Sequence, residues 1–367
     1  MAAAVRDTQP YSTGISYPLP ISIKEFHRLE EQVICLADLM GRTTHAPIPP
    51  KPSILLDIGC GTGAVTCYLG HAHPTAHVYG IDLSPVPNFH PKPPNVTYIQ
   101  GDAHDISVLD PRLVPGTADL AFARLLICGI RDWLACISDM RDMMKPGAWI
   151  ESQELNASVF DSSGRNIDDE MEWVRVMRQA MAMVENGLDP DAGSNVKRCM
   201  EEAGLVDVQS HVFRRPVGTW LADEEPGTKR VGEYDGKEMW TPMAVVLDEL
   251  AVGKGRYGID EVEELKRQMR RDMKPKVKGE KGVHFVFTVT LDLVTKQETI
   301  TNDRPNYTPH VNSQSTPHPN PTLPPSLPTY PHNPTYATLS SLNHQTTPNA
   351  TTLHPSARPD PTRNPNK

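Results

Sequence analysis

The chain has 367 residues, a hydrophobic fraction of 38% and a formal net charge of −9. Its length and apolar content allow a sizeable core and an enclosed ligand site. The acidic balance argues against a protein that mainly neutralises nucleic-acid phosphates, because such domains usually carry a basic face. We therefore expect a small molecule or a protein as the partner, and no nucleic acid.

The cysteines are scattered and form no CxxC pair: Cys35, Cys60, Cys67, Cys128, Cys136 and Cys199. Several lie in apolar runs, where a cysteine behaves as a small hydrophobic residue, so a reducing intracellular compartment fits them best. No run approaches the roughly 20 apolar residues of a membrane span, and the first residues lack the apolar stretch of a secretory signal. We expect a protein of the cytoplasm or nucleus with no membrane partner, and the oligomeric state stays open.

Short β-rich runs alternate with helical stretches, which is the pattern of repeated βαβ units. Strands are predicted at residues 53–58, 77–81, 96–100, 118–123, 148–153, 206–213 and 283–292. A helix is expected over Ile130 to Met144, where apolar residues recur at helical spacing before a Lys-Pro-Gly sequence ends it. A second is expected over 194–203, with a Ser or Asn start and Gly204 at its end. The pattern predicts one α/β domain with a seven-stranded, mostly parallel sheet and helices on both faces.

Two stretches, 161–191 and 216–278, exceed a minimal crossover. They carry the amphipathic segment MEWVRVMRQAMAMV and helices predicted near 240–251 and 260–273. Long insertions at the open end of an α/β sheet usually form lids or specificity walls. Their Met and Trp residues either pack the added helices or contact a substrate. The basic sequence KRQMRRDMKPKVKGEK is a solvated helix face or a nuclear signal.

From about residue 301 the composition changes abruptly to Pro, Thr, Asn, Ser and His. Such a segment cannot bury enough surface to offset its ordering entropy, so we predict a disordered tail with polyproline II character. It is either a ligand for proline-binding modules or a tail without function, including a gene-model artefact. The predicted organisation is an N-terminal helical segment and flap at 1–50, the α/β domain at 51–300 and the tail at 301–367.

The most informative sequence is ILLDIGCGTGAVTCYL, an apolar strand ending in Asp57, then Gly59, Gly61 and Gly63, then a helical run. Glycines at this place let backbone N–H groups approach a ligand at the carboxyl end of the strand. The spacing is GxGxG, whereas the dinucleotide-binding fingerprint is GxGxxG. An acidic residue before the first glycine also suits a ligand with an ammonium group and no pyrophosphate.

Two further acidic residues follow at the ends of the next two predicted strands, Asp82 in YGIDLS and Asp102 in IQGDAHD. A carboxylate at the second strand end can accept hydrogen bonds from both ribose hydroxyls, and one at the third can accept from the adenine amine. Taken singly, Asp82 is also explained as a helix N-terminal acid and Asp102 as a turn former. Together with the glycine loop they predict a nucleoside site.

Over about residues 20–290 the chain resembles class I S-adenosylmethionine (SAM)-dependent methyltransferases, specifically the fungal LaeA-like enzymes. The resemblance is carried by DIGCGTG, YGIDLS, GDAHD, ADLAFARLLICGIRDWLACISDMRDMMKPGAWIESQEL and EEAGLVDVQSHVFRRPVGTW. In relatives an Arg follows the fourth strand, an Asp-Trp pair opens the next helix and KPGGW leads into a strand ending in acidic residues. The matching residues here are Arg124, Asp132, Trp133, Lys145, Pro146, Gly147, Ala148, Trp149, Glu151 and Glu154.

Three features depart from the family pattern, and one is the tail that follows the last predicted strand. Ala148 replaces the second glycine of KPGG, which a negative φ would tolerate. The acidic, aromatic N-terminal segment of relatives is here the shorter YPLPISIKEFHRLEEQ.

The resemblance implies a Rossmann-like class I methyltransferase fold with helical insertions and SAM as the cofactor. The residues implied to hold the methionine and ribose parts are Asp57, Gly59, Cys60, Gly61 and Gly63. Those implied at the ribose and adenine are Asp82, Leu83, Asp102 and Ala103, and those near the sulfonium are Arg124 and Leu125. Arg124 has an alternative, a salt bridge to an acid such as Asp119 or Glu151.

No catalytic residue is assigned, because methyl transfer can be driven by positioning in a dry pocket. A hydroxyl acceptor would need a base, and the candidates are His104, His211, Glu151 and Glu154. His211, in a predicted strand, is equally explained by packing. We expect no metal: HAHPTAH is typical of a helix end and a turn, since no Cys or acidic partner completes a tetrahedral set.

Three functions are compatible with these patterns. The first is a SAM-dependent methyltransferase acting on an unidentified small molecule, which the resemblance places in secondary metabolism. The second is a LaeA-like nuclear regulator of secondary metabolism that acts through protein partners. The third, a nucleotide-binding oxidoreductase, is disfavoured by the GxGxG spacing.

Overall fold

The computed structural model describes residues 18–183, 187–252 and 256–294, all within one compact unit, Met1–Thr301. The predicted tail at 301–367 lies outside the described residues. No helix in the described part is long and apolar enough to cross a membrane.

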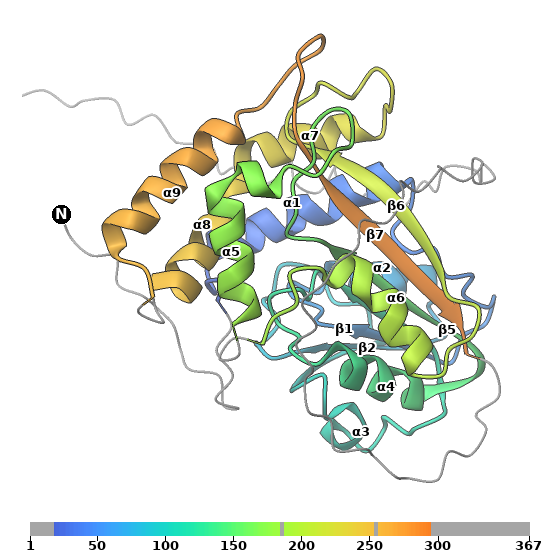
Figure 1. Cartoon of the computed structure of the whole chain (residues 1–367). Coiled ribbons are helices and arrows are strands. Elements are labelled where there is room, and N and C mark those ends of the chain that lie inside the picture. The colour runs from blue at the N-terminus through green and yellow to red at the C-terminus, as the bar shows by residue number, and fades with distance from the viewer. Residues whose placement is uncertain (1–17, 184–186, 253–255, 295–367) are drawn as a thin grey trace, which may run out of the picture. The chain divides into compact units, whose positions relative to one another are not determined.

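Seven strands form one sheet in the order β3-β2-β1-β4-β5-β7-β6 (Figure 1). Their bounds are β1 Ile54–Ile58, β2 His77–Asp82, β3 Val96–Gln100, β4 Ala118–Arg124, β5 Met144–Leu155, β6 Gln209–Pro216 and β7 His284–Leu293. The pairs from β3 to β5 are parallel, and β7 runs antiparallel to both β5 and β6. The predicted seven-stranded, mostly parallel sheet is confirmed.

Alternate residues of the central strand face two different layers of helices, as the two-residue period of a strand requires. Leu55 packs in a cluster with residues of α2, whereas Leu56 packs in a cluster with residues of α4 and α6. The helices of these layers are α2 Ala64–Ala72, α3 Ile106–Leu109, α4 Trp133–Met143 and α6 Ala192–Glu202. The sheet is therefore covered on both faces.

Helix α4 begins at Trp133, three residues later than its apolar pattern predicts. The Asp132 side chain accepts a hydrogen bond from the N–H of Ala135 at 2.9 Å, which caps the helix at that point. Before it, the N–H groups of Gly129 and Ile130 both donate to the carbonyl of Leu126, so the preceding residues form a separate turn. The cap therefore sets the start of the helix, although the apolar spacing extends back to Ile130.

Strand β5 begins at Met144 and includes the Lys-Pro-Gly sequence that ends α4. Gly147 has a φ of 84° and its N–H donates to the carbonyl of Val294 at 2.8 Å. Ala148 is not among the described residues with positive φ, so the departure from KPGG is tolerated as expected.

The two insertions add a group of helices at one end of the sheet (Figure 1). These are η1 Asp168–Glu170, α5 Glu172–Ala182, α7 Thr228–Glu238, α8 Trp240–Val246, the π-helical η2 Leu247–Val252 and α9 Ile259–Asp272. Trp173, Met177 and Met243 are buried in the main core cluster. The Met and Trp residues of the insertions therefore pack the added helices.

Helix α1, Ile23–Met40, precedes the sheet in sequence and packs on α7. It begins at Ser22, whose hydroxyl accepts from the N–H of Glu25 at 3.2 Å, and ends at Gly41, which has a φ of 74°. Leu36 and Met40 of α1 share a buried cluster with Val231 of α7 and with residues of β7.

Candidate active site

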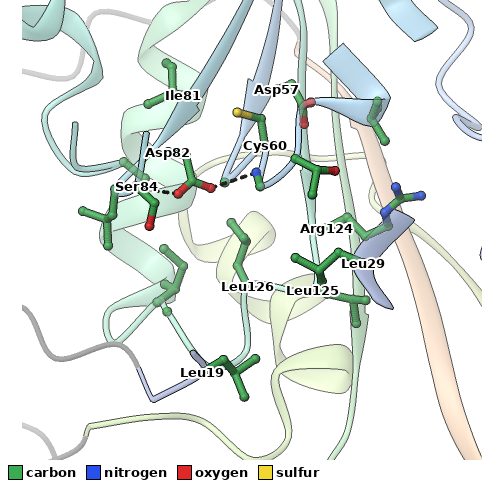
Figure 2. Close-up of a pocket in the computed structure, with 18 of the residues that line it drawn as sticks. Leu19, Leu29, Asp57, Cys60, Ile81, Asp82, Ser84, Arg124, Leu125 and Leu126 are labelled. Atoms are coloured by element: carbon green, nitrogen blue, oxygen red, sulfur yellow. Dashed lines mark hydrogen bonds between the residues drawn. The ribbon is translucent and has the colours of Figure 1, made fainter. Parts of the chain in front are cut away.

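A pocket of about 290 Å³ lies at the carboxyl ends of β1, β2 and β4 (Figure 2). Its walls come from the glycine loop after β1, from the segments that follow β2, β3 and β4, and from the N-terminal segment that leads into α1. This edge is where open α/β sheets bind their ligands. The predicted site residues that line it are Asp57, Gly59, Cys60, Gly61, Asp82, Leu83, Asp102, Ala103, Arg124 and Leu125.

The glycine loop is bent back against the end of β2. Gly59 and Gly61 have φ values of 66° and 55°, in the region that favours glycine. The N–H of Gly59 donates to the carbonyl of Ile81 at 2.7 Å. A Cβ added at Gly59 would overlap the side chain of Leu126, which reaches across the pocket toward the loop (Figure 2). The loop therefore favours glycine for its backbone angles, and a side chain at Gly59 would also displace the end of Leu126.

The Asp82 carboxylate is held by two backbone groups. One oxygen accepts from the N–H of Gly61 at 2.8 Å, and the other accepts from the N–H of Ser84 at 2.8 Å (Figure 2). Burial raises the pKa of Asp82, and these two backbone hydrogen bonds lower it. Each oxygen keeps a further lone pair, so the oriented carboxylate can accept from a pair of hydroxyls.

Asp57 lies deeper, at the end of β1, and is buried. Burial raises its pKa to about 6, while the hydroxyl of Thr66, which donates to it at 2.6 Å, and the charge of Arg124 lower that pKa. Asp102 lies at the end of β3 and accepts from the N–H of His104 at 3.0 Å. The turn-forming role of Asp102 and its place in the pocket wall therefore coexist.

Arg124 and Leu125 close the pocket at the end of β4 (Figure 2). The guanidinium of Arg124 lies 5.7 Å from the centre of the Phe122 ring. Leu125 has a φ of 55° and is the one non-glycine residue with positive φ in the described part of the chain. Such backbone strain in a bulky residue is uncommon and concentrates at ligand sites.

Asp119 and Glu151, the two acids considered as salt-bridge partners of Arg124, interact with other groups. Asp119 pairs with Lys145 and accepts from the N–H of Ser53. Glu151 accepts from the N–H groups of His45 and Ala46, both at 2.7 Å.

Gly63 is not among the residues that line this pocket, so its part in cofactor binding stays a prediction. It is the residue before α2, with a φ of 79°, and a Cβ there would overlap the hydroxyl of Tyr98. The third glycine of the motif therefore gives the helix room against β3.

Three of the four candidate bases lie outside the pocket wall. Glu151 and Glu154 are buried acceptors of backbone hydrogen bonds, and His211 on β6 stacks with His45 at 6.4 Å between ring centres. His104 does line the pocket, and a hydrogen bond to Asp139 raises its pKa. The two candidates at the acidic end of β5, Glu151 and Glu154, are therefore occupied by backbone hydrogen bonds.

The N-terminal wall of the pocket was not among the predicted site residues. Its members are Leu19, Pro20, Ile21, Glu25, Phe26, Leu29, Gln32 and Val33. Phe26 packs edge-to-face on Phe89 of the segment after β2, with ring centres 5.8 Å apart, and so ties α1 to the pocket. All of these residues except Val33 belong to the sequence YPLPISIKEFHRLEEQ. The predicted flap at 1–50 includes this segment, but none of its residues is among those predicted to be part of the site.

The insertions at 161–191 and 216–278 contribute no described residue to this pocket wall, and their expected role as lids stays a prediction. Their apolar faces are used in packing one another and α1.

The third histidine of HAHPTAH, His77, begins β2, and the other two lie at the end of α2, as the sequence predicts. His71 is in its last turn and bonds through Nδ1 to the carbonyl of Cys67 at 2.8 Å, and His73 is its C-terminal cap. Within residues 18–183, 187–252 and 256–294, no group of three or more His, Cys, Asp or Glu side chains could hold a metal ion.

Comparison with known proteins places these features in a family. The family profile described as "Methyltransferase domain" matches residues 29–210. The chain is 31% identical over 239 residues to methyltransferase pytC of Aspergillus terreus, covering 63% of this chain and 71% of that protein. It is 28% identical over 224 residues to the secondary metabolism regulator laeA of Aspergillus niger, covering 58% and 56%.

Among solved structures, a geranyl diphosphate C-methyltransferase from Streptomyces coelicolor is similar with a TM-score of 0.39 and 16% identity, covering 74% of this chain and 82% of that one. The family assignment rests on the match to the family profile and on the identity with the relatives. The sheet order and the motif residues in the pocket agree with it. The chain belongs to the class I SAM-dependent methyltransferases of the fungal LaeA-like type.

Proposed function

We propose that this pocket binds SAM and presents its methyl group to a small-molecule acceptor of secondary metabolism. The single observation that carries the proposal is the Asp82 carboxylate, fixed by Gly61 and Ser84 with lone pairs left for two hydroxyls. The glycine loop fits the same ligand, because a side chain at Gly59 would displace Leu126, which lines the pocket.

The residues proposed to hold the cofactor follow the strand ends. Asp57 and the loop Gly59 to Gly61 would hold the methionine part, Asp82 and Leu83 the ribose and adenine, and Asp102 and Ala103 the adenine edge. Arg124 and Leu125 would lie near the sulfonium, and Gly63 would let α2 begin close to Tyr98 of β3.

When bound, SAM supplies an electrophilic methyl group that is displaced in line, with the bonding electron pair remaining on sulfur. The contribution of the protein is to align the acceptor with that methyl group and to exclude water. Leu29, Leu125 and Leu126 give the pocket an apolar lining on this side (Figure 2). Positioning therefore supplies the catalysis, and the proposal includes no dedicated base.

A second function is supported by the relatives named secondary metabolism regulator. In that case the same domain would act in the nucleus through protein partners. An enzyme that acts on a small molecule could work in the cytoplasm as well as in the nucleus. The free cysteines of the described chain agree with either compartment.

The decisive experiment uses the full chain. Calorimetric titration with SAM should show micromolar binding, and incubation with methyl-tritiated SAM and fungal extract should place the label in the small-molecule fraction. Label only in the protein fraction would favour the regulator, and no SAM binding to the folded chain would overturn both.

A further inference from the structure

Helix α1 brings one carboxylate, that of Glu25, to the pocket wall. Glu25, Leu29 and Gln32 are spaced so that they share one face of the helix, and all three line the pocket. Figure 2 shows Leu29 beside Leu125, at the β4 side of the pocket. Only 9% of the Glu25 side chain is exposed to solvent, so this carboxylate is shielded from water.

The orientation of Glu25 is fixed from behind by Arg28. Nε and Nη2 of Arg28 donate to the two carboxylate oxygens at 2.8 and 2.6 Å, in the parallel two-bond geometry that Arg–carboxylate pairs favour. A carboxylate offers about four acceptor positions. Two are used by Arg28, so the carboxylate keeps acceptor positions for a ligand.

Arg28 is itself anchored to α7. Its Nη1 donates to the hydroxyl of Tyr234 at 2.7 Å, and that hydroxyl donates back to the carbonyl of Arg28 at 3.2 Å. Tyr234 is buried and directly precedes Asp235, which pairs with Arg215. The charges of Asp235 and Arg215 both act on the Tyr234 hydroxyl. This gives the second insertion a role: it holds α1, and with it Glu25, in place over the pocket.

Glu25 shares the pocket wall with residues of the β4–α4 connection. Burial raises the pKa of the Cys128 thiol to about 12, and among the charges that act on this thiol are those of Arg28 and Glu25. Cys128 stands between Leu126 and Gly129, which both line the pocket. The proposed cofactor residues lie at the ends of β1, β2, β3 and β4, and none of them is on α1. Glu25 therefore lies on a wall that those residues leave free for the acceptor.

Glu25 and Arg28 form a neutral pair, so the pair offers no net attraction to a charged acceptor but retains a strong hydrogen-bond acceptor. Around it Leu29, Leu126 and Ile130 are apolar. This combination suits a compact apolar molecule that carries a hydroxyl or N–H group.

We propose that Glu25, held by Arg28 and Tyr234, is the residue that selects an uncharged acceptor with a hydrogen-bond donor and orients that donor in the pocket. The proposal rests on the proposed function, since it assigns the acceptor side of the same site. Glu25 would touch the acceptor, and Arg28 and Tyr234 are positioning residues.

The test uses the full chain saturated with S-adenosylhomocysteine and two probes of equal shape, indole and benzofuran, followed by ligand-observed NMR. Indole has an N–H donor and benzofuran has none. A hydrogen bond to a charged group contributes about 1.5–3 kcal/mol, so the wild-type chain should bind indole at least about tenfold more tightly. Glu25→Ala should reduce this preference to within about twofold, and Glu25→Gln, which keeps an acceptor for Arg28, should leave an intermediate preference.

Glu31→Ala is the matched control, because Glu31 is on the same helix and exposed; it should keep the wild-type preference. Absence of any preference in the wild-type chain, or its persistence in Glu25→Ala, overturns the proposal. Loss of S-adenosylhomocysteine binding in Glu25→Ala and Glu25→Gln also overturns it, since Glu25 would then only support the cofactor pocket. Failure of the wild-type chain to bind S-adenosylhomocysteine would instead overturn the proposed function itself.

Discussion

The Asp82 carboxylate accepts a hydrogen bond from the backbone N–H of Gly61 at 2.8 Å, which ties the end of β2 to the glycine loop after β1. Its second oxygen is fixed in the same way by Ser84 at 2.8 Å. One side chain therefore sets the shape of the loop and the direction of its own free lone pairs.

This double role predicts that Asp82→Ala will lower the affinity for SAM at least about tenfold, because charge-assisted hydrogen bonds contribute about 1.5–3 kcal/mol each. Asp82→Asn should lose less, since its amide oxygen still accepts. Calorimetric titration measures both, with Asp223→Ala as control because Asp223 pairs with Lys278 on the surface. An Asp82→Ala chain that binds SAM like the wild type would remove Asp82 from the site.

The glycine loop gives a prediction in which strain and space can be separated. Gly59 and Gly116 both have positive φ, 66° and 76°, but a Cβ at Gly59 overlaps Leu126 whereas a Cβ at Gly116 meets nothing within 4 Å. Both alanine variants should lose roughly 1 kcal/mol of stability from the backbone angle. Gly59→Ala should in addition lose SAM binding at least tenfold.

Thermal unfolding measures the loss of stability in the two variants, and calorimetry measures their affinity for SAM. Equal SAM affinity in Gly59→Ala and Gly116→Ala would show that the cradle does not need the space at Gly59.

The parts of the site that the sequence predicts are those set by one strand and its end. Because parallel strands finish at one edge of a sheet, the order of the strand ends alone brings Asp57, Asp82 and Asp102 together. The three strands that carry them are found within one residue of their predicted bounds.

The parts that it does not predict depend on contacts between distant segments. Glu151 is one of four candidate bases in the sequence, but its carboxylate accepts from the N–H of His45, 106 residues away. The wall formed by α1 includes a contact between Phe26 and Phe89. This contact cannot be predicted from the types of the two residues or from their spacing in the sequence. Gly63 belongs to the glycine motif yet faces Tyr98.

Glu154 should make stability depend on pH. Burial raises its pKa to about 8, from an ordinary value of 4.5, although the N–H groups of Leu126 and Ile127 and the charge of Arg124 lower it. The folded state therefore keeps a proton that the unfolded state releases. The stabilisation is present below pH 4.5 and is lost as the pH rises toward about 8, by at most about 1.4 kcal/mol per pH unit.

Glu154→Gln removes this titration, so the difference in unfolding free energy between wild type and variant should shift with pH across that window. Urea unfolding of both chains at several pH values measures the difference, and other titrating groups cancel in it. A difference that stays constant with pH would mean that Glu154 is ionised in the folded chain.

The pair formed by Arg215 on β6 and Asp235 on α7 should be among the most sensitive in the fold. Both side chains have 0% exposure, and Nε and Nη2 of Arg215 donate to the two oxygens of Asp235, each at 2.7 Å. Asp235→Ala would leave a buried guanidinium without its counter-ion, which costs about 3–5 kcal/mol.

A matched exposed pair links the same helix α7 to α1: Arg230 and Asp38, with 48% and 43% of their side chains exposed. Asp38→Ala should therefore cost no more than about 1 kcal/mol. Denaturant unfolding distinguishes the two variants. The double substitution Arg215→Met with Asp235→Leu should recover most of the stability, because replacing both charges removes the desolvation cost together with the attraction. Equal losses for Asp235→Ala and Asp38→Ala would show that water reaches the Arg215–Asp235 pair.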